Sequence, residues 1–270
     1  MVSDSNKTLN NIINSAIGTF VAEIITLPIC TLKTVYQNNP TFTILDTYKH
    51  IYYYYGQSHN NNHHSYRGFF QASSPAIISQ IVSTSSKYSA YEFIKSIRNT
   101  NIVGDNTNIV GEKDNKIILL NNSINGIVGG LMGSIVTHPF DLWKNFAQRN
   151  ESYIHHLEKN NKNIKSLISN GLYQGYSGSI AKNIVLYASL FPLLDYYQSL
   201  TLYFWLASLG TTLSVSLLIQ PFDYYKVVKM ANVEGKIIKN PFRGFSLLLA
   251  RSIPHLFITM SLTKFLHNYL

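Results

Sequence analysis

Cysteine and charge are both scarce in this chain. Cys30 is the single cysteine among 270 residues, and one cysteine can form neither an internal disulfide framework nor a thiolate metal cage. Only 13% of the residues are charged, whereas 46% are hydrophobic. Soluble domains carry about 25% charged residues, so a surface solvated by water alone would be poorly supplied. The composition therefore indicates a protein that sits in a lipid bilayer.

Acidic residues are the scarcer sign of charge. Lys and Arg together number 22 against 13 Asp and Glu, which gives a formal charge of +9. This excess suits an anionic partner or the head groups of anionic lipids. Nucleic acid is a poor candidate, because the basic residues are scattered between apolar stretches and form no continuous stripe.

Six apolar stretches are long enough to cross the roughly 30 Å core of a bilayer. Three of them, residues 12–32, 117–140 and 199–222, contain one charge in total, that of Glu23. The other three stretches, residues 69–97, 176–194 and 245–263, are more polar and contain Lys87, Lys182 and Arg251, respectively. Helices with such charges are expected to line a cavity. The sequence predicts an all-α membrane protein of six transmembrane helices.

A six-residue pattern, Pro-x-x-x-x-Lys, occurs three times, each time at the predicted end of an apolar helix. The copies are PICTLK at 28–33, PFDLWK at 139–144 and PFDYYK at 221–226. A polar connector follows each copy and leads to an aromatic-x-Gly sequence, which ends at Gly68, Gly175 and Gly244. One copy alone would mark only a helix end with a surface ion pair, but three indicate a tandem array. We expect three units, 1–102, 103–200 and 201–270, each made of a helix, a connector and a helix.

The array resembles the mitochondrial carrier family, whose three repeats carry Pro-x-[Asp/Glu]-x-x-[Lys/Arg] on the odd helices and aromatic-x-Gly on the even ones. The resemblance covers residues 10–270. It implies a threefold pseudosymmetric bundle that moves a solute by alternating access in the mitochondrial inner membrane. It also implies short surface helices in the connectors, which residues 41–55 and 151–168 can form, whereas the third connector is much shorter.

The resemblance implies a gate of ion pairs at the connector end, in which the acid of one motif pairs with the base of the next. Asp141 would pair with Lys226 and Asp223 with Lys33, while Lys144 would lack an acid because Cys30 stands in its place. Glutamines that brace such pairs match Gln37 and Gln148, with Met230 in the third unit. A second gate at the opposite mouth would use charges on the even helices, namely Glu92, Lys95 and Asp195.

Charges at mid-membrane are costly and persist only with a polar partner or water. The resemblance implies that a residue shortly after the glycine of each aromatic-x-Gly sequence contacts the substrate. These residues are Lys182, with Asn183 beside it, and Arg251. In the first unit the same position is Pro75, with Ser79 or Gln80 as alternatives. Glu23 is expected in the same cavity, with three alternative roles: binding an amino group of the substrate, relaying a proton, or neutralising Lys182 or Arg251. Tyr187 can stack on a nucleobase or simply pack between helices. Two cations and one acid favour an anionic substrate.

Other ligands have weaker support in the sequence. Two histidine pairs, 63–64 and 155–156, have no acid or cysteine at ligand spacing, so neither a metal nor a cofactor is expected. The aromatic-x-Gly helix starts have free backbone N–H groups that can hold cardiolipin phosphates; their glycines are Gly68, Gly175 and Gly244. We expect a monomer.

The predicted function is transport of an anionic metabolite, with a nucleotide favoured over a carboxylate or keto acid, since Lys and Arg bind phosphate and carboxylate alike. An alternative is a degenerate carrier that serves as a membrane adaptor or receptor, because Cys30, Met230 and the short third connector depart from the pattern. A membrane enzyme is disfavoured, because no nucleophile and base are placed as a pair.

Overall fold

The chain folds into a bundle of long helices with a layer of short helices at one end. The computed structural model describes residues 2–55, 66–83, 85–86, 112–161, 163–201, 203–231 and 240–269, and none of these residues forms a strand. The long helices are α1 (Val2–Asn38), α5 (Glu112–Gln148), α8 (Tyr176–Leu200), α9 (Phe204–Met230) and α10 (Phe245–Tyr269). The described residues therefore form an all-α fold, as predicted.

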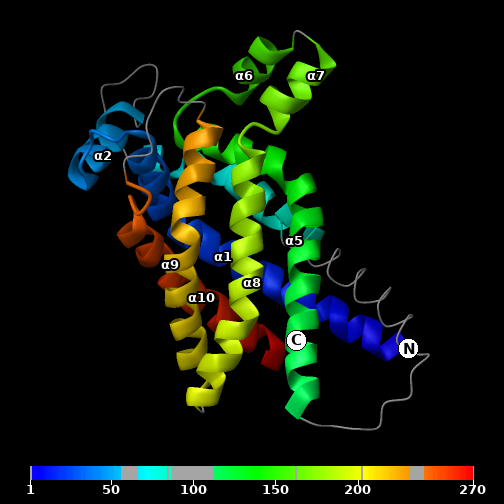
Figure 1. Cartoon of the computed structure of the whole chain (residues 1–270). Helices are drawn as coiled ribbons and strands as arrows, with labels where there is room; N and C mark the ends of the chain where they lie inside the picture. The colour runs from blue at the N-terminus through cyan, green and yellow to red at the C-terminus, as the bar shows by residue number, and fades with distance from the viewer. Residues whose placement is uncertain are drawn as a thin grey trace.

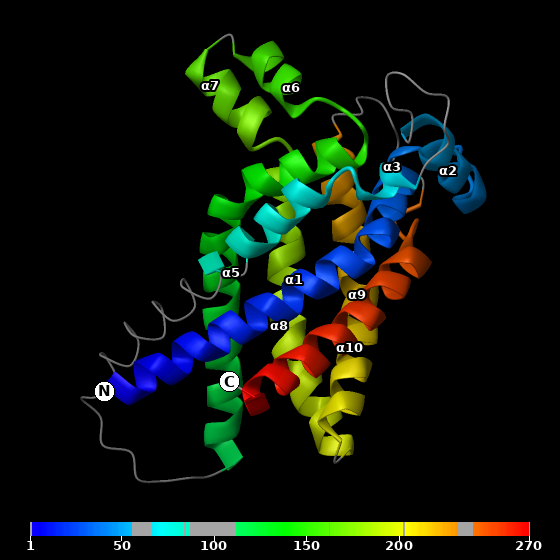
Figure 2. The ribbon, with the colours of Figure 1, turned by 180° about the vertical axis from the view of Figure 1, so that it is seen from behind.

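The order of the helices around the bundle follows the order of the chain. Helices α5, α8 and α9 run side by side (Figure 1), with α8 packed against both of the others. Helix α1 lies along α10, and these two helices run in opposite directions across the far side of the bundle (Figure 2). Helix α10 also contacts α9. The short helix α3 (Arg67–Phe70) and the helical residues 73–83 lie beside α1.

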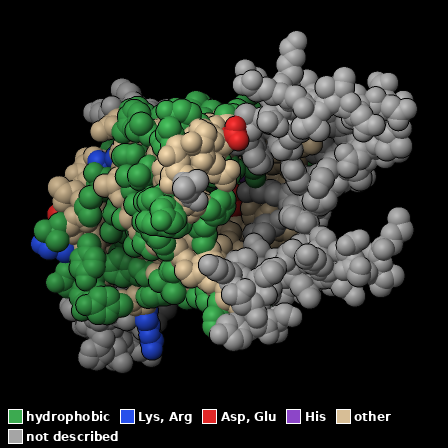
Figure 3. All heavy atoms as spheres, turned by 90° about the horizontal axis from the view of Figure 1, so that it is seen from below, with side chains coloured by type: hydrophobic (Ala, Val, Ile, Leu, Met, Phe, Trp, Pro, Cys, Tyr) green, Lys and Arg blue, Asp and Glu red, His purple; other side chains and the backbone are tan. Residues whose placement is uncertain are grey.

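Several of the helices are long and apolar enough to cross a membrane. Among the described residues there are four such segments: Ile17–Asn38, Tyr176–Leu200, Phe204–Met230 and Phe245–Leu262. Hydrophobic side chains make up much of the described surface in Figure 3. The predicted span at 117–140 lies within α5, and the one at 69–97 runs beyond the described residues, so the count of six crossings stays a prediction.

Helix α9 shows how this sequence divides its faces between the bundle and lipid. Small and polar side chains such as Ser208, Thr211 and Ser216 are buried, whereas Leu213 and Leu217 are exposed. Small residues let membrane helices approach closely, and polar ones are tolerated where they face the bundle interior. The same logic applies to the cations on the membrane-length helices that line the interior, such as Lys33, Lys182 and Arg251.

The motif prolines do not end their helices, which corrects the sequence-based expectation. Pro28, Pro139 and Pro221 lie inside α1, α5 and α9, which continue to Asn38, Gln148 and Met230. A proline removes one backbone donor and distorts the helix around it, but in a membrane bundle the neighbouring helices and polar side chains compensate for that loss. The charges of each motif therefore stand on a helical turn inside the bundle.

The connectors form a layer at one end of the bundle (Figure 1). The first holds α2 (Ile44–His50) and the π-helical η1 (Ile51–Tyr55); the second holds α6 (Tyr153–Asn160), α7 (Ile164–Ser166) and the π-helical η2 (Leu167–Leu172). The chain begins α2 with a capping box, in which Thr43 and Asp46 satisfy each other's backbone N–H groups. The short connector helices expected in the first two units are confirmed, while most of the third connector lies outside the described residues.

Three polar clamps join each unit to the next at the connector end. Gln71 Nε2 donates to the carbonyl of Ala147 (2.9 Å), and Gln174 Nε2 donates to that of Met230 (3.0 Å). Arg243 closes the ring by donating to the carbonyls of Asn39 (2.7 Å) and Phe42 (2.6 Å). Each clamp satisfies carbonyls at or just beyond the end of a motif helix, α1, α5 or α9, and these carbonyls have no partner within that helix. These contacts have the cyclic order expected of three similar units, although the unit boundaries themselves stay a prediction.

Candidate functional site

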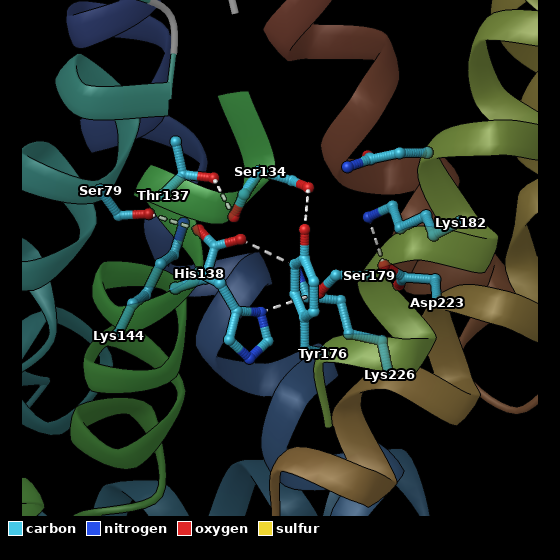
Figure 4. Close-up of polar contacts among 12 residues, drawn as sticks. Ser79, Ser134, Thr137, His138, Lys144, Tyr176, Ser179, Lys182, Asp223 and Lys226 are labelled. Carbon is cyan, nitrogen blue, oxygen red and sulfur yellow. Dashed lines mark hydrogen bonds and ion pairs between the residues drawn. The ribbon is translucent and has the colours of Figure 1, made fainter. Parts of the chain in front are cut away.

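A polar cavity of about 230 Å³ lies inside the bundle, next to the connector end. Helices α1, α5, α8, α9 and α10 and residues 73–83 all contribute to its wall. Most of its lining is polar, as Figure 4 shows for the part between α5, α8 and α9. The charged residues in the lining are Lys33, Lys144, Lys182, Lys226, Arg251, Asp141 and Asp223.

The two ion pairs implied by the motif rule are present. Lys33 on α1 contacts Asp223 on α9, and Lys226 Nζ on α9 lies 2.8 Å from Asp141 Oδ2 on α5. Ser79 donates a further hydrogen bond of 2.6 Å to Asp141 Oδ1. These pairs tie the odd helices together beside the connectors; that they act as a gate stays a prediction.

Lys144 does have an acidic partner, which corrects the expectation that its pair is missing. The partner is Glu23, about two helical turns before Cys30 on α1, whose Oε1 accepts from Lys144 Nζ. Cys30 itself accepts a hydrogen bond from Gln148 Nε2 at 3.2 Å. The rule fails here because it reads one fixed position in each motif. A lone carboxylate within an apolar span, which must find a cation when buried, was the signal that could have revealed the pair.

Glu23 and Asp223 each hold two cations. Besides Lys144, Glu23 accepts from Arg251 Nη2 at 2.7 Å through Oε2; besides Lys33, Asp223 accepts from Lys182 through Oδ1. Both carboxylates are buried, with side chains 1% and 6% exposed. The two cations predicted to contact substrate, Lys182 and Arg251, are therefore bound to carboxylates that also serve the motif lysines.

The cavity carries an excess of positive charge. Its five Lys and Arg side chains face the carboxylates of Glu23, Asp141 and Asp223, which leaves two positive charges among these described residues. Each shared carboxylate neutralises only one of its two cations. Since a buried charge is costly without a counter-charge, the cavity favours an anionic occupant.

The remaining predicted contacts divide between the cavity and the helix interfaces. Asn183, Ser79 and Gln80 line the cavity. Tyr187 does not: its ring packs on Gly130 of α5, where an added Cβ would lie 2.1 Å from Cε2. The structure thus places Tyr187 in helix packing, the second of the two roles considered for it. Pro75 is buried but is not part of the cavity wall.

The two glutamines of the motif regions differ in what they hold. Gln148 accepts a 2.8 Å hydrogen bond from Thr34 and so joins α5 to α1 beside the cavity. Gln37, which was expected to brace an ion pair, instead donates to the carbonyl of Arg243 at 3.1 Å. It lies against Gly244, whose φ of +83° suits a residue without Cβ. Gln37 therefore fastens the third unit to the first.

Several predicted sites remain untested by these contacts. Glu92, Lys95 and His63–His64 lie outside the described residues, and Asp195 is exposed on α8. Gly175 and Gly244 precede α8 and α10, and Gly68 lies within α3. No group of three metal-ligating residues occurs among the residues that were placed. Burial lowers the pKa of His156, and its ring faces the carbonyl of Asn170 at 3.1 Å, so this imidazole is structural.

A polar network around His138 was missed at the level of sequence. His138 precedes the motif proline of α5, and its Nδ1 lies 3.0 Å from Ser179 Oγ (Figure 4). Its Nε2 lies 3.0 Å from the carbonyl of Gln174. Gln220, which precedes the proline of α9, likewise donates to the carbonyl of Arg243 at 2.8 Å. In both units the residue before the proline makes a hydrogen bond to a backbone carbonyl just before the following long helix, α8 for His138 and α10 for Gln220. A polar residue before a proline in an apolar span was the available signal.

Long apolar helices around a charged cavity of about 230 Å³, with ion pairs between successive units at one end, define the class of membrane solute carriers. The comparisons with known proteins give the family. Residues 4–101 match the model of the mitochondrial carrier protein family. The chain is also 37% identical over 264 residues to the mitochondrial carrier-like protein L276 of Acanthamoeba polyphaga mimivirus, covering 96% of each chain.

The chain belongs to the mitochondrial carrier family. It is accordingly a multi-pass membrane protein of the solute-carrier type. Members of this family are transporters and not enzymes, which fits the absence of a paired nucleophile and base from the sequence-based analysis.

Proposed function

We propose that this protein carries an anionic metabolite across the mitochondrial inner membrane by alternating access. The observation that carries the proposal is the charge of the cavity, where Lys182 and Arg251 share their carboxylates with Lys33 and Lys144. An entering oxyanion can replace Asp223 at Lys182 and Glu23 at Arg251, since each carboxylate keeps a second cation. The substrate thereby competes directly with the contacts between units.

Alternating access follows from this competition. In this proposal the connector end is the closed one, which the inter-unit ion pairs and carbonyl clamps formed there support. A substrate shifts the balance only if it binds one state better than the other. An anion that takes over Lys182 and Arg251 weakens the closed end, and exchange of one anion for another completes the cycle.

A nucleotide is the favoured substrate, with a carboxylate or keto acid second. Phosphate groups and carboxylates both form strong charge-assisted hydrogen bonds with Lys and Arg. Two uncompensated cations suit an anion with at least two negative charges. We also propose that the membrane lipid cardiolipin binds with its phosphates at the free backbone N–H groups at the start of α8 and α10.

The structure offers less reason for a degenerate adaptor than the sequence did. Lys144 keeps an acid in Glu23 although Cys30 replaces the expected one, and Met230 packs with Leu142 and Phe146 in a buried cluster. Both departures from the family pattern are thus accommodated in the fold.

Uptake by proteoliposomes tests the proposed function. We expect vesicles containing the purified protein to take up labelled ATP, 2-oxoglutarate or phosphate against the same unlabelled anion inside. Lys182→Ala and Arg251→Ala should each lower the initial rate by at least tenfold, because each removes a cation from the substrate site. Lys159→Ala is the matched control, since Lys159 is exposed on α6, and should leave the rate unchanged. No uptake of any of the three anions would support the adaptor instead.

A further inference from the structure

A second cavity, of about 310 Å³, adjoins the first on the side away from the connectors. Gln80 and Arg251 line both cavities, and the second is completed by Thr212, Ser252, His255 and Leu256. Helix α10 runs from the connector end toward the opposite end of the bundle (Figure 2), so His255 lies about one turn beyond Arg251 in that direction. Arg251 thus stands between the two cavities, and His255 lies beside it in the wall of the second cavity.

His255 faces the same carboxylate oxygen that holds Arg251. Its Nε2 lies 3.9 Å from Glu23 Oε2, and that oxygen accepts from Arg251 Nη2 at 2.7 Å. A separation of 3.9 Å is too long for a hydrogen bond. The other ring nitrogen, Nδ1, lies 3.5 Å from Thr259 Oγ1. In this state the imidazole is therefore near Glu23 without being bound to it.

The charges around His255 come from three helices. Glu23 is on α1, Lys144 on α5 and Arg251 on α10. Thr212 of α9 and Gln80, the other polar residues that line this cavity with His255 from neighbouring segments, do not titrate. Among the residues that the structure describes, two cations and one carboxylate leave one net positive charge beside the ring, so in the empty carrier a proton on His255 would add to that excess.

An anion bound at Arg251 reverses this balance. The anion cancels the excess charge, and it frees Glu23 Oε2 from Arg251 to accept a hydrogen bond from a protonated His255. Anion binding and proton binding therefore favour each other, and by linkage each raises the affinity for the other by the same factor. The residues required for this coupling are all in place in the closed-end state.

We propose that His255 takes up one proton from water when the substrate anion binds and that the carrier moves the two together. This inference rests on the proposed function and deepens it, since proton cotransport allows net uptake without a counter-anion. The proton is taken from the aqueous phase on the side of the second cavity and released on the other side with the anion, so no covalent bond changes. The proton-binding group is the imidazole of His255, with Glu23 as its positioning partner.

The test is uptake driven by a pH gradient in proteoliposomes that contain no internal anion substrate. The probes are labelled ATP, 2-oxoglutarate and phosphate, with the membrane potential held at zero by potassium and valinomycin and with protein-free vesicles as a blank. For one cotransported proton, an interior one pH unit more alkaline should give a tenfold accumulation at equilibrium, and collapse of the gradient with nigericin should abolish it. Accumulation that ignores the gradient would overturn the proposal.

Substitution of His255 separates this proposal from transport as such. His255→Gln should still exchange internal for external anion, with a raised KM because no coupled proton supports anion binding, and should lose the gradient-driven accumulation. His155→Gln, at an exposed position on α6, should behave as wild type. Retained exchange also shows that the variant is folded. If exchange occurs and His255→Gln still accumulates the anion with the gradient, the proton site is wrong and transport stands; if wild type exchanges none of the anions, the proposed function fails.

An independent measurement covers a variant that fails to fold. In a weakly buffered detergent solution of the wild-type protein near pH 7, addition of the probe anion that is exchanged should withdraw protons from solution, detected with a pH indicator. No proton uptake on binding, or release of protons, would contradict the coupling.

Discussion

Glu23→Gln should destabilise the protein by about 3–5 kcal/mol, the cost expected when one partner of a buried ion pair is removed. The carboxylate of Glu23 is 1% exposed and is the shared partner of Lys144 and Arg251. Glutamine keeps the shape of the side chain but leaves both cations without a counter-charge in the bundle. The measurement is the unfolding temperature of the purified protein in detergent, together with its yield in the membrane fraction.

Two further variants show whether the loss comes from stranded charge. Glu158→Gln, at an exposed position on α6, should leave the unfolding temperature unchanged. Adding Arg251→Gln to Glu23→Gln removes one stranded cation, so the double variant should be more stable than the sum of the two single losses predicts. Additive losses would mean that Glu23 and Arg251 do not interact in the folded protein.

Asp223→Asn should impair transport more than Asp141→Asn, although the two substitutions are chemically identical. Asp223 holds Lys33 and Lys182 and is nearly inaccessible, whereas Asp141 holds Lys226 in a contact whose carboxylate is 29% exposed. Loss of the more deeply buried carboxylate leaves Lys33 and Lys182 facing an uncharged side chain in a setting of weak screening. We expect a drop in initial uptake rate of more than tenfold for Asp223→Asn and a smaller drop for Asp141→Asn.

The single cysteine reports the opening that should accompany this change. Cys30 is 6% exposed and lines the cavity close to the connector end. In Asp223→Asn a membrane-impermeant thiol reagent added on the connector side should modify Cys30 faster than in wild type, because the ion pairs that close that end are weakened. Equal labelling rates in the two proteins, or a larger transport defect in Asp141→Asn, would contradict this assignment.

The sequence predicted those contacts that follow from repetition. The pairs of Lys33 with Asp223 and Lys226 with Asp141 were implied by the resemblance to the carrier family, whose rule could be applied because the motif repeats on three similar helices. The charged character of the cavity followed from Lys182 and Arg251 for a related reason, since neither can face lipid. Length and composition alone indicated the apolar helices.

Contacts that depend on how helices tilt and rotate could not be predicted. Glu23, two turns before the expected position at Cys30, binds Lys144, and Gln37 binds a backbone carbonyl of the third unit. Such contacts depend on the oblique course of α1 and α10 relative to α5, α8 and α9 (Figure 2). The motif prolines leave their helices unbroken, since packing compensates for the missing donor. The proximity of His255 to Glu23 depends on the same crossing of α1 and α10.

The most direct test of the account is a charge swap between Lys226 and Asp141, the motif pair that joins α9 to α5 beside the connectors. Asp141→Lys and Lys226→Asp should each abolish exchange of the probe anion, because each places like charges side by side at the end that must close. The double variant restores the pair in reverse and should recover a substantial part of the wild-type rate. A double variant as inactive as the single ones, or single variants that transport as well as wild type, would contradict closure by ion pairs between units.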